Sequence, residues 1–392
     1  MLKKDNFFKS YFVNSNRYYL NIKKTKKIYN SFLTDLKNSK MPLFESYKKD
    51  YKFDFSTSTI KKFSKYNNIV IIGMGGSILG TKSIYSFLKQ KIKKEVFFFD
   101  NLDLNLYSEY KKIKSLKNSC FIVISKSGNT LETLTNLNTI FSKSLLKNKL
   151  IIITELKDSN LIKIGNRFNA EIIEHKDFIG GRYSVLSEVG MFPAALMNLN
   201  INKFKNLKKL INNKYFVRSL INNVSSIYAL NQRGIKNSVI LNYDSQLNNL
   251  SLWHQQLVAE SLGKKGKGVT PIVSACPKDH HSLLQLYLDG PKDKFFTFFS
   301  SYAKKSNKIE SIINAQCEAT KNIFKKKRIP YRSFVFKKND ESELGTVFIF
   351  FILETILLAR LMNVNPYDQP AVEQVKNETR KFLRKKFSKN YF

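Results

Sequence analysis

NIVIIGMGGSILG, residues 68–80, joins an apolar, β-branched run to a glycine-rich loop. The run 68–73 predicts a buried strand, and Gly75 and Gly76 predict a tight turn into a helix that Ser77 opens. Such a junction presents free backbone N–H groups and the positive end of a helix to an anion. A strand-to-helix turn without a ligand is the alternative. The pattern is not GxGxxG with a following acidic residue, so it supports a dinucleotide only weakly.

A second junction of this kind follows the apolar run CFIVIS, residues 120–125. It continues as SKSGNTLET, residues 125–133, with Glu132 in the first turn of the expected helix. Because ligands of parallel α/β sheets bind at the carboxyl ends of strands, two such junctions favour a phosphate site over an incidental capped loop. The candidate phosphate ligands are three hydroxyls and one ammonium: Ser125, Ser127, Thr130 and Lys126.

Further apolar runs predict two successive series of strands and helices, and therefore an α/β fold. The expected strands are EVFFFDN (95–101), LIIITE (150–155), AEIIEH (170–175), SVILNY (238–243), FFTFF (295–299) and RSFVFK (332–337). We expect an N-terminal helical segment over 1–65, a first domain over 66–200 that binds phosphate, a second domain over 201–363 and a C-terminal helix within 364–392.

The stretch FIGGRYSVLSEVGMFPAAL, residues 178–196, closes the expected first domain. Gly181 allows close approach of a ligand to the backbone, and the planar fork of Arg182 suits an anion or a developing oxyanion. The apolar residues that follow predict a buried helix, which we expect to kink or restart at Pro193. A glycine turn with a surface arginine is the alternative.

Three later segments carry further candidates for chemistry. On the helix expected within residues 247–268, Gln256 and Glu260 are i, i+4 neighbours, and Glu260 is either a general base or a solvated carboxylate. The segment 276–290 holds the adjacent pair His280 and His281, which is a poor metal site. In the last segment, VNPYDQPAVEQVKNETRKFL (364–383), Gln369, Glu373 and Lys376 fall near one helix face, which also suits a polar tail helix.

Composition limits the functional classes. The chain has 67 Lys and Arg against 30 Asp and Glu, a net charge of +37, but the lysines are spread along the sequence. We therefore favour compositional drift over nucleic-acid binding. The N-terminus lacks an apolar signal-peptide core, and the apolar run Val347–Leu353 is followed by Glu354, which favours a buried helix over a membrane span. Three cysteines without metal-ligand spacing fit reduced thiols in the cytoplasm.

The motifs together resemble the glucose-6-phosphate isomerase family, and they occur in the family's order over most of the chain. They are GMGGSILG, SKSGNTLET, GGRYSVLS with PAAL, Gln256 with ESLGK, HHS, and NPYDQPAVE with Lys376. The resemblance implies two sugar-isomerase (SIS) domains, each a parallel sheet flanked by helices, with helical N- and C-terminal extensions. It also implies interconversion of D-glucose 6-phosphate and D-fructose 6-phosphate through a cis-enediolate, in glycolysis and gluconeogenesis.

The resemblance assigns roles to individual residues. Glu260 matches the base, Arg182 the group that stabilises the enediolate, and His281 and Lys376 the ring-opening pair. The implied phosphate ligands are Ser77, Ser125, Lys126, Ser127 and Thr130, and the sugar site is lined by Gly75, Gly76, Glu132, Gly181, Gln256 and Gln369. No metal or other cofactor is implied. The family's ring-opening histidine comes from the neighbouring subunit, so a homodimer is implied.

The sequence departs from the family pattern in three of these motifs. Leu262 stands where the family has Asn, and Ala371 replaces a usual Gly. Unusual residues precede the histidine pair, so His280 competes with His281 for the ring-opening role. Three other functions remain as hypotheses: a bifunctional glucose/mannose phosphate isomerase, a SIS-type regulator that binds a sugar phosphate without catalysis, and a basic nucleic-acid-binding protein. We expect no nucleic acid and no membrane among the partners.

Overall fold

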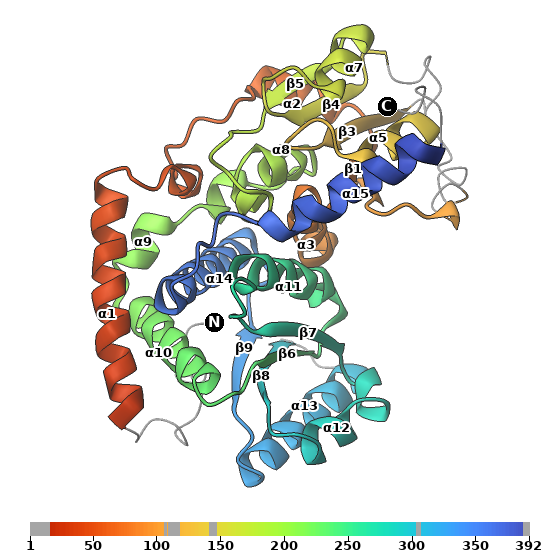
Figure 1. Cartoon of the computed structure of the whole chain (residues 1–392). Helices are drawn as coiled ribbons and strands as arrows, with labels where there is room; N and C mark the ends of the chain where they lie inside the picture. The colour runs from red at the N-terminus through yellow and green to blue at the C-terminus, as the bar shows by residue number, and fades with distance from the viewer. Residues whose placement is uncertain (1–15, 106–107, 109–117, 141–146, 303–306, 387–392) are drawn as a thin grey trace.

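The computed structural model describes residues 16–105, 108, 118–140, 147–302 and 307–386 of the 392-residue chain. Two parallel β-sheets, each with helices packed on it, lie in the upper and lower halves of the molecule in Figure 1. The expected α/β class, with two parallel sheets flanked by helices, is therefore confirmed.

The first sheet has the strand order β2-β1-β3-β4-β5, with every neighbouring pair parallel. Its register places Gly73 opposite Ile124, so the loops that follow β1 and β3 leave the sheet side by side. The chain also reverses its direction along the sheet between these two strands, which is where open α/β sheets bind ligands. The strands are β1 Asn68–Gly73, β2 Glu95–Phe99, β3 Ser119–Ile124, β4 Leu150–Thr154 and β5 Glu171–Glu174.

The helices of the first half lie before the first strand, between strands and after the last strand of this sheet. The α-helices are α2 Thr57–Ser64, α3 Leu79–Leu88, α5 Leu131–Ile140, α7 Asn160–Phe168 and α8 Glu188–Leu196. The short 3-10 helices are η1 Pro42–Tyr47, η2 Gly75–Ser77, η3 Lys89–Lys91 and η5 Gly181–Leu186.

The helix expected after Arg182 restarts at Ser187 and not at Pro193. The Ser187 hydroxyl accepts a hydrogen bond from the Val189 N–H, which caps α8, and α8 then continues through Pro193. The six residues before Ser187 form η5, so Arg182 lies outside α8.

The second sheet has the order β7-β6-β8-β9 and is also parallel. Its strands are β6 Asn237–Asn242, β7 Thr270–Ala275, β8 Lys294–Ser301 and β9 Tyr331–Phe336. The sequence did not predict β7, because Pro271 stands second in it. The sheet accommodates this proline because β7 is an edge strand, where a missing N–H need not cost a ladder hydrogen bond.

The second half is rich in helices, including the Lys- and Asn-rich residues 202–216. The elements are η6 Ile201–Phe204, α9 Leu207–Ile211, α10 Lys214–Asn231, η7 Ser245–Leu247, α11 Asn248–Leu262, η8 Lys278–His281, α12 Leu284–Asp289, α13 Lys308–Lys326 and α14 Glu341–Met362.

Helix α14 has the length and apolar composition of a membrane span, with a mean hydropathy of 2.1. However, 83% of its most apolar window is buried inside the protein, where it contacts α10 and α11. Near its middle, Glu354 forms a buried ion pair with Arg332 of β9, with Nη2 and Oε2 2.9 Å apart. The apolar surface of α14 is thus used in the core, as expected for the run Val347–Leu353.

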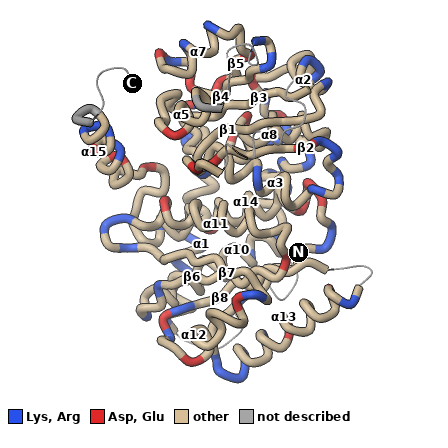
Figure 2. Tube along the Cα trace, turned by 90° about the vertical axis from the view of Figure 1, so that its right-hand side faces the viewer, with Lys and Arg blue, Asp and Glu red and all other residues tan. Residues whose placement is uncertain are grey.

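The two terminal helices differ in how they are packed. Helix α1 (Asn16–Lys37) lies along α10 and also contacts α14. Helix α15 (Pro370–Lys386) projects from the body of the molecule in Figure 2, and its residues 370–382 are exposed. The same view shows Lys and Arg on most elements of both halves, in keeping with their spread along the sequence.

Candidate active site

Two glycine loops contact each other at the centre of the candidate site. A Cβ built on Gly76 would lie 2.3 Å from the carbonyl carbon of Gly181 and 2.6 Å from the nitrogen of Arg182. A Cβ on Gly75, whose φ is +53°, would lie 2.9 Å from Nε2 of Gln256. Only residues without a side chain let η2, η5 and α11 approach this closely. The loop after β1 and the glycine pair before Arg182 therefore form one structure.

Arg182 lies at the centre of this site, and its side chain is 2% exposed. Its Nε donates to Oγ of Ser261 at 2.9 Å, and its Nη1 donates to Glu260 at 3.2 Å and to Gln369 at 3.1 Å. Its Nη2 donates to main-chain carbonyls within residues 366–368. A guanidinium held at all three nitrogens keeps one orientation, as stabilisation of a developing oxyanion requires. The alternative of a solvated surface arginine is therefore wrong.

The Glu260 carboxylate is held from two sides. One oxygen accepts from Arg182 and the other accepts from Nε2 of Gln256 at 2.8 Å. The Glu260 side chain remains 27% exposed, so a ligand can reach it. A carboxylate that is fixed beside a guanidinium and open to a ligand can take a proton from carbon while the neighbouring cation balances the charge on oxygen.

A further set of contacts, not predicted from the sequence, supports Arg182. The Tyr183 hydroxyl lies 2.8 Å from Oγ of Ser261 and donates to the Pro366 carbonyl at 2.9 Å. The Lys264 ammonium lies 3.2 Å from Asp368 and donates to the Ser261 carbonyl at 3.1 Å. Burial lowers the pKa of Lys264, and Asp368 opposes that shift. Ser261 and Lys264 lie in the motif ESLGK beside Glu260, and this proximity in sequence could have identified them as site residues.

The loop after β3 has the form of a hydroxyl-lined cradle. Ser125 and Thr130 are hydrogen bonded through their hydroxyls at 2.8 Å, and Gly128 makes the turn at a φ of +67°. Ser127 is exposed, and Thr130 directly precedes α5. The hydroxyls and the start of α5 therefore lie at the carboxyl edge of the first sheet, where they can bind a phosphate.

Three other expected ligands surround this cradle. Ser77 lies in η2, after the neighbouring strand β1, and Glu132 is half-buried in the first turn of α5. The Lys126 ammonium donates to the Asp177 carbonyl at 2.6 Å and lies 3.6 Å from Glu155. Lys126 thus connects the loop after β3 to the segment that precedes Gly181 through its hydrogen bond to Asp177.

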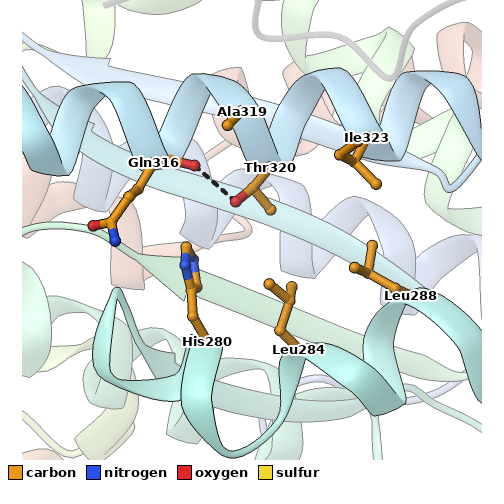
Figure 3. A pocket seen from close by; sticks show the side chains of 7 residues that line it. All are labelled: His280, Leu284, Leu288, Gln316, Ala319, Thr320 and Ile323. Carbon is orange, nitrogen blue, oxygen red and sulfur yellow. Dashed lines mark hydrogen bonds between the residues drawn. The ribbon is translucent and has the colours of Figure 1, made fainter.

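His280 and His281 have different environments. Nε2 of His280 lies 2.7 Å from the Tyr243 hydroxyl, which donates to Thr320 at 3.0 Å. Because the hydroxyl proton of Tyr243 is donated to Thr320, Nε2 of His280 must be the donor to Tyr243. His280 lines a cavity of about 220 Å³. Figure 3 shows its ring facing Gln316 and Thr320 of α13 across this cavity. Burial lowers the pKa of His280. His281 is exposed.

His281 and Glu260 lie at opposite edges of the second sheet. Helix α11 follows β6 and leads back to the start of β7, so Glu260, near the end of α11, lies toward the amino edge of the strands. His281 follows β7 and lies at the carboxyl edge. The 15 residues of α11 span about 22 Å between these edges. The described chain therefore does not bring His281 to its own Glu260.

Gln369 and Lys376 are separated by about two turns of chain. Gln369 accepts from Arg182, whereas Lys376 is exposed on α15 and its ammonium lies 2.6 Å from Glu373. The structure thus brings together Gly75, Gly76, Gly181, Arg182, Gln256, Glu260 and Gln369, and leaves Lys376 on the projecting helix.

Comparison with known proteins gives one consistent result. The family model described as phosphoglucose isomerase matches residues 37–276. A glucose-6-phosphate isomerase of Methanocaldococcus jannaschii is 33% identical over 355 residues, which are 84% of this chain and 87% of that protein. Another, of Campylobacter jejuni, is 29% identical over 82% of this chain and 86% of that one.

Solved structures share the fold. A hypothetical protein of Thermus thermophilus superposes with a TM-score of 0.77 at 22% identity, covering 92% of this chain and 94% of that one. A glucose-6-phosphate isomerase of Chlamydia trachomatis superposes with a TM-score of 0.70 at 19% identity, covering 83% and 71%.

Proposed function

As a member of the phosphoglucose isomerase family, the chain interconverts D-glucose 6-phosphate and D-fructose 6-phosphate, and we propose that Glu260 and Arg182 carry the proton transfer. The reaction is a step of glycolysis and gluconeogenesis. Aldose–ketose isomerisation moves one proton between C2 and C1 and places negative charge on the neighbouring oxygens. It therefore needs one base beside one fixed cation.

The single observation that carries this proposal is the Arg182–Glu260 contact at 3.2 Å, inside a site where Arg182 is bound at all three nitrogens. In the proposed mechanism Glu260 takes the proton from C2 of the open aldose and returns it to C1. Arg182 stabilises the cis-enediolate between these steps. Gln256 keeps the second oxygen of Glu260 in place through its hydrogen bond.

The loop after β3 is the proposed phosphate site. Its hydroxyls, the start of α5 and the adjacent η2 support this role, because they meet where the loops of β1 and β3 leave the sheet. The proposed phosphate ligands are Ser77, Ser125, Ser127 and Thr130, with Lys126 adding positive charge. The sugar is proposed to lie against Gly75, Gly76, Glu132, Gly181, Gln256 and Gln369.

Ring opening is proposed to use His281 of the neighbouring subunit of a homodimer, with Lys376 as its partner. Two observations support His281 over His280: His281 is exposed, and His280 donates to Tyr243 instead. The separation of His281 from Glu260 across the second sheet supports its action in another subunit's site. The chain is proposed to work in the cytoplasm, which its three free cysteines support.

Coupled assays separate the hypotheses. We expect the purified chain to convert fructose 6-phosphate to glucose 6-phosphate. Added glucose-6-phosphate dehydrogenase then oxidises the product and reduces NADP, which is the signal that is measured. Mannose 6-phosphate, assayed in parallel for conversion to fructose 6-phosphate, distinguishes a bifunctional isomerase. A folded chain that binds fructose 6-phosphate without converting it would instead be a regulator.

A further inference from the structure

A groove of about 540 Å³ lies between α1 and the segment α9–α10, on the left of the molecule in Figure 1. Helix α10 has α1 on one side and α14 on another, and α14 in turn contacts α11, which carries Glu260. None of the residues that line the groove belongs to the candidate active site. The groove is therefore a separate surface of the molecule.

The groove is positively charged, and no negatively charged side chain lines it. Lys26, Lys214 and Arg218 line it. Within the part of the chain that the structure describes, these three cations form no ion pair and no hydrogen bond to another residue. Because like charges around one hollow repel each other, an anion bound there would be stabilised.

The start of α10 adds to this charge. Lys214 is the first residue of this 18-residue helix, and Asn213 caps it by accepting from the N–H groups of Tyr215 and Phe216. Arg218 lies one turn further along the same helix. The positive end of the helix dipole therefore lies beside two of the three cations, Lys214 and Arg218, and Lys26 of α1 lines the same groove.

The remainder of the groove is largely apolar. Ile22, Val217 and Ile221 line it, as does Tyr29, whose hydroxyl donates to the Ile211 carbonyl at 3.3 Å. A volume of about 540 Å³ falls within the range of small-molecule sites. Apolar walls beside unpaired cations suit a ligand with both characters.

We propose that this groove binds a small organic anion that carries a phosphate or carboxylate head on an apolar body. The head would lie between Lys214, Arg218 and Lys26, and the body against Ile22 and Val217. The site is independent of the isomerase reaction and of the residues proposed for it.

The test measures binding of two probes, 1-naphthyl phosphate and 1-naphthoate, to the full chain by isothermal titration in the presence of saturating fructose 6-phosphate. Comparison of the two probes shows which head the groove prefers. Inorganic phosphate and 1-naphthol supply the head and the body alone. We expect either complete probe to bind at least about tenfold more tightly than both fragments, since charge and apolar contact act together.

Three variants assign the binding to the groove. We expect Lys214→Gln/Arg218→Gln to weaken probe binding at least about tenfold, because both cations at the helix start are lost. Val217→Trp keeps the charges, fills the hollow and should have a similar effect. The matched control Lys24→Gln/Lys27→Gln removes the same charge from exposed positions of α1 that do not line the groove.

The outcomes are distinct. Isomerase activity should be unchanged in all three variants, which also shows that they fold. Weaker binding in both groove variants but not in the control supports the proposal. Equal weakening in the control would mean diffuse attraction to a basic chain, and unchanged binding in the groove variants would place the probe elsewhere. Either result, or a wild-type chain that binds neither complete probe, overturns the proposal.

Discussion

Gly76 and Gly181 meet in an asymmetric contact. A Cβ on Gly76 would lie 2.3 Å from the carbonyl carbon of Gly181, whereas a Cβ on Gly181 would lie 3.7 Å from Cα of Gly76, which is ordinary contact. The close approach of the two loops therefore depends on the absence of a side chain at Gly76. The same change at the two glycines should have unequal consequences.

We expect Gly76→Ala to lower the free energy of unfolding by about 1–3 kcal/mol, because the added methyl group must push η2 away from η5. Gly181→Ala should cost less than about 1 kcal/mol, since its methyl group meets no close neighbour. Urea unfolding of both variants measures the difference. Equal losses in the two variants would contradict the asymmetric contact.

Glu260→Gln should lower kcat by about 10²–10⁴-fold, because the amide cannot accept the C2 proton. The coupled assay measures kcat, and circular dichroism checks the fold. Glu378→Gln, which removes a carboxylate from exposed α15, is the matched control and should retain wild-type activity. A Glu260→Gln variant with wild-type kcat would place the base elsewhere.

Ser261 positions Arg182 by accepting from its Nε at 2.9 Å. Ser261→Ala should therefore lower kcat about tenfold, equivalent to about 1.4 kcal/mol, with little change in KM. Ser251→Ala removes another buried hydroxyl of α11, one that donates to the Leu247 carbonyl at 3.0 Å. Both variants should lose similar stability. If kcat falls equally in both, the effect of Ser261→Ala is structural, and the proposed positioning of Arg182 by Ser261 is contradicted.

Mixing of two inactive variants tests the donation of His281 across subunits. In a random mixture of Glu260→Gln and His281→Gln chains, a hybrid dimer would contain one site with both residues intact. About one quarter of all sites should then be active, as the symmetry of a two-subunit assembly requires. If His281 acts within its own chain, the mixture stays as inactive as its components.

Lys205 is fully buried, with its ammonium 3.5 Å from the ring centre of Phe53, and burial lowers the pKa of Lys205 from 10.5 to about 7. Between pH 7 and pH 8.5 the unfolded chain therefore binds more protons than the folded chain, and stability rises with pH. The contribution over this interval is at most about 2 kcal/mol.

The variant Lys205→Met should lose this pH dependence, because a neutral side chain has no proton to release. Urea unfolding at pH 7 and pH 8.5 gives the difference for each protein. The control Lys203→Met changes an exposed lysine two residues away and should keep the wild-type slope. A Lys205→Met variant whose stability still rises as steeply would show that another group is responsible.

Much of the fold could be predicted from short apolar runs. The run 68–73 matches β1 residue for residue, and the other expected strands agree within two residues at each end, because β-branched buried segments carry a strong local signal. Strand β7 was missed, since Pro271 weakens a local strand pattern that only its edge position makes acceptable. The restart of α8 at Ser187 was missed because a serine cap competed with a more conspicuous proline.

The candidate site was harder to predict from local sequence patterns than the fold was. Gln256 and Glu260 could be paired from their spacing on one helix, and the structure shows that hydrogen bond. The contacts of Arg182 with Ser261 and Gln369 join residues 79 and 187 positions apart, and no periodicity within one element encodes them. His280 and His281 are neighbours in sequence, and only the tertiary contact with Tyr243 distinguishes them.

All three guanidinium nitrogens of Arg182 donate hydrogen bonds, and this has a consequence for synthesis of the chain on the ribosome. Its partners lie at residues 260–261 and 366–369, so the guanidinium remains unanchored until the last segment has emerged and folded back. Domains generally fold as they leave the ribosome, amino-terminal part first. The first sheet can therefore form early, while a nascent chain that ends before residue 366 cannot assemble the complete set of Arg182 contacts.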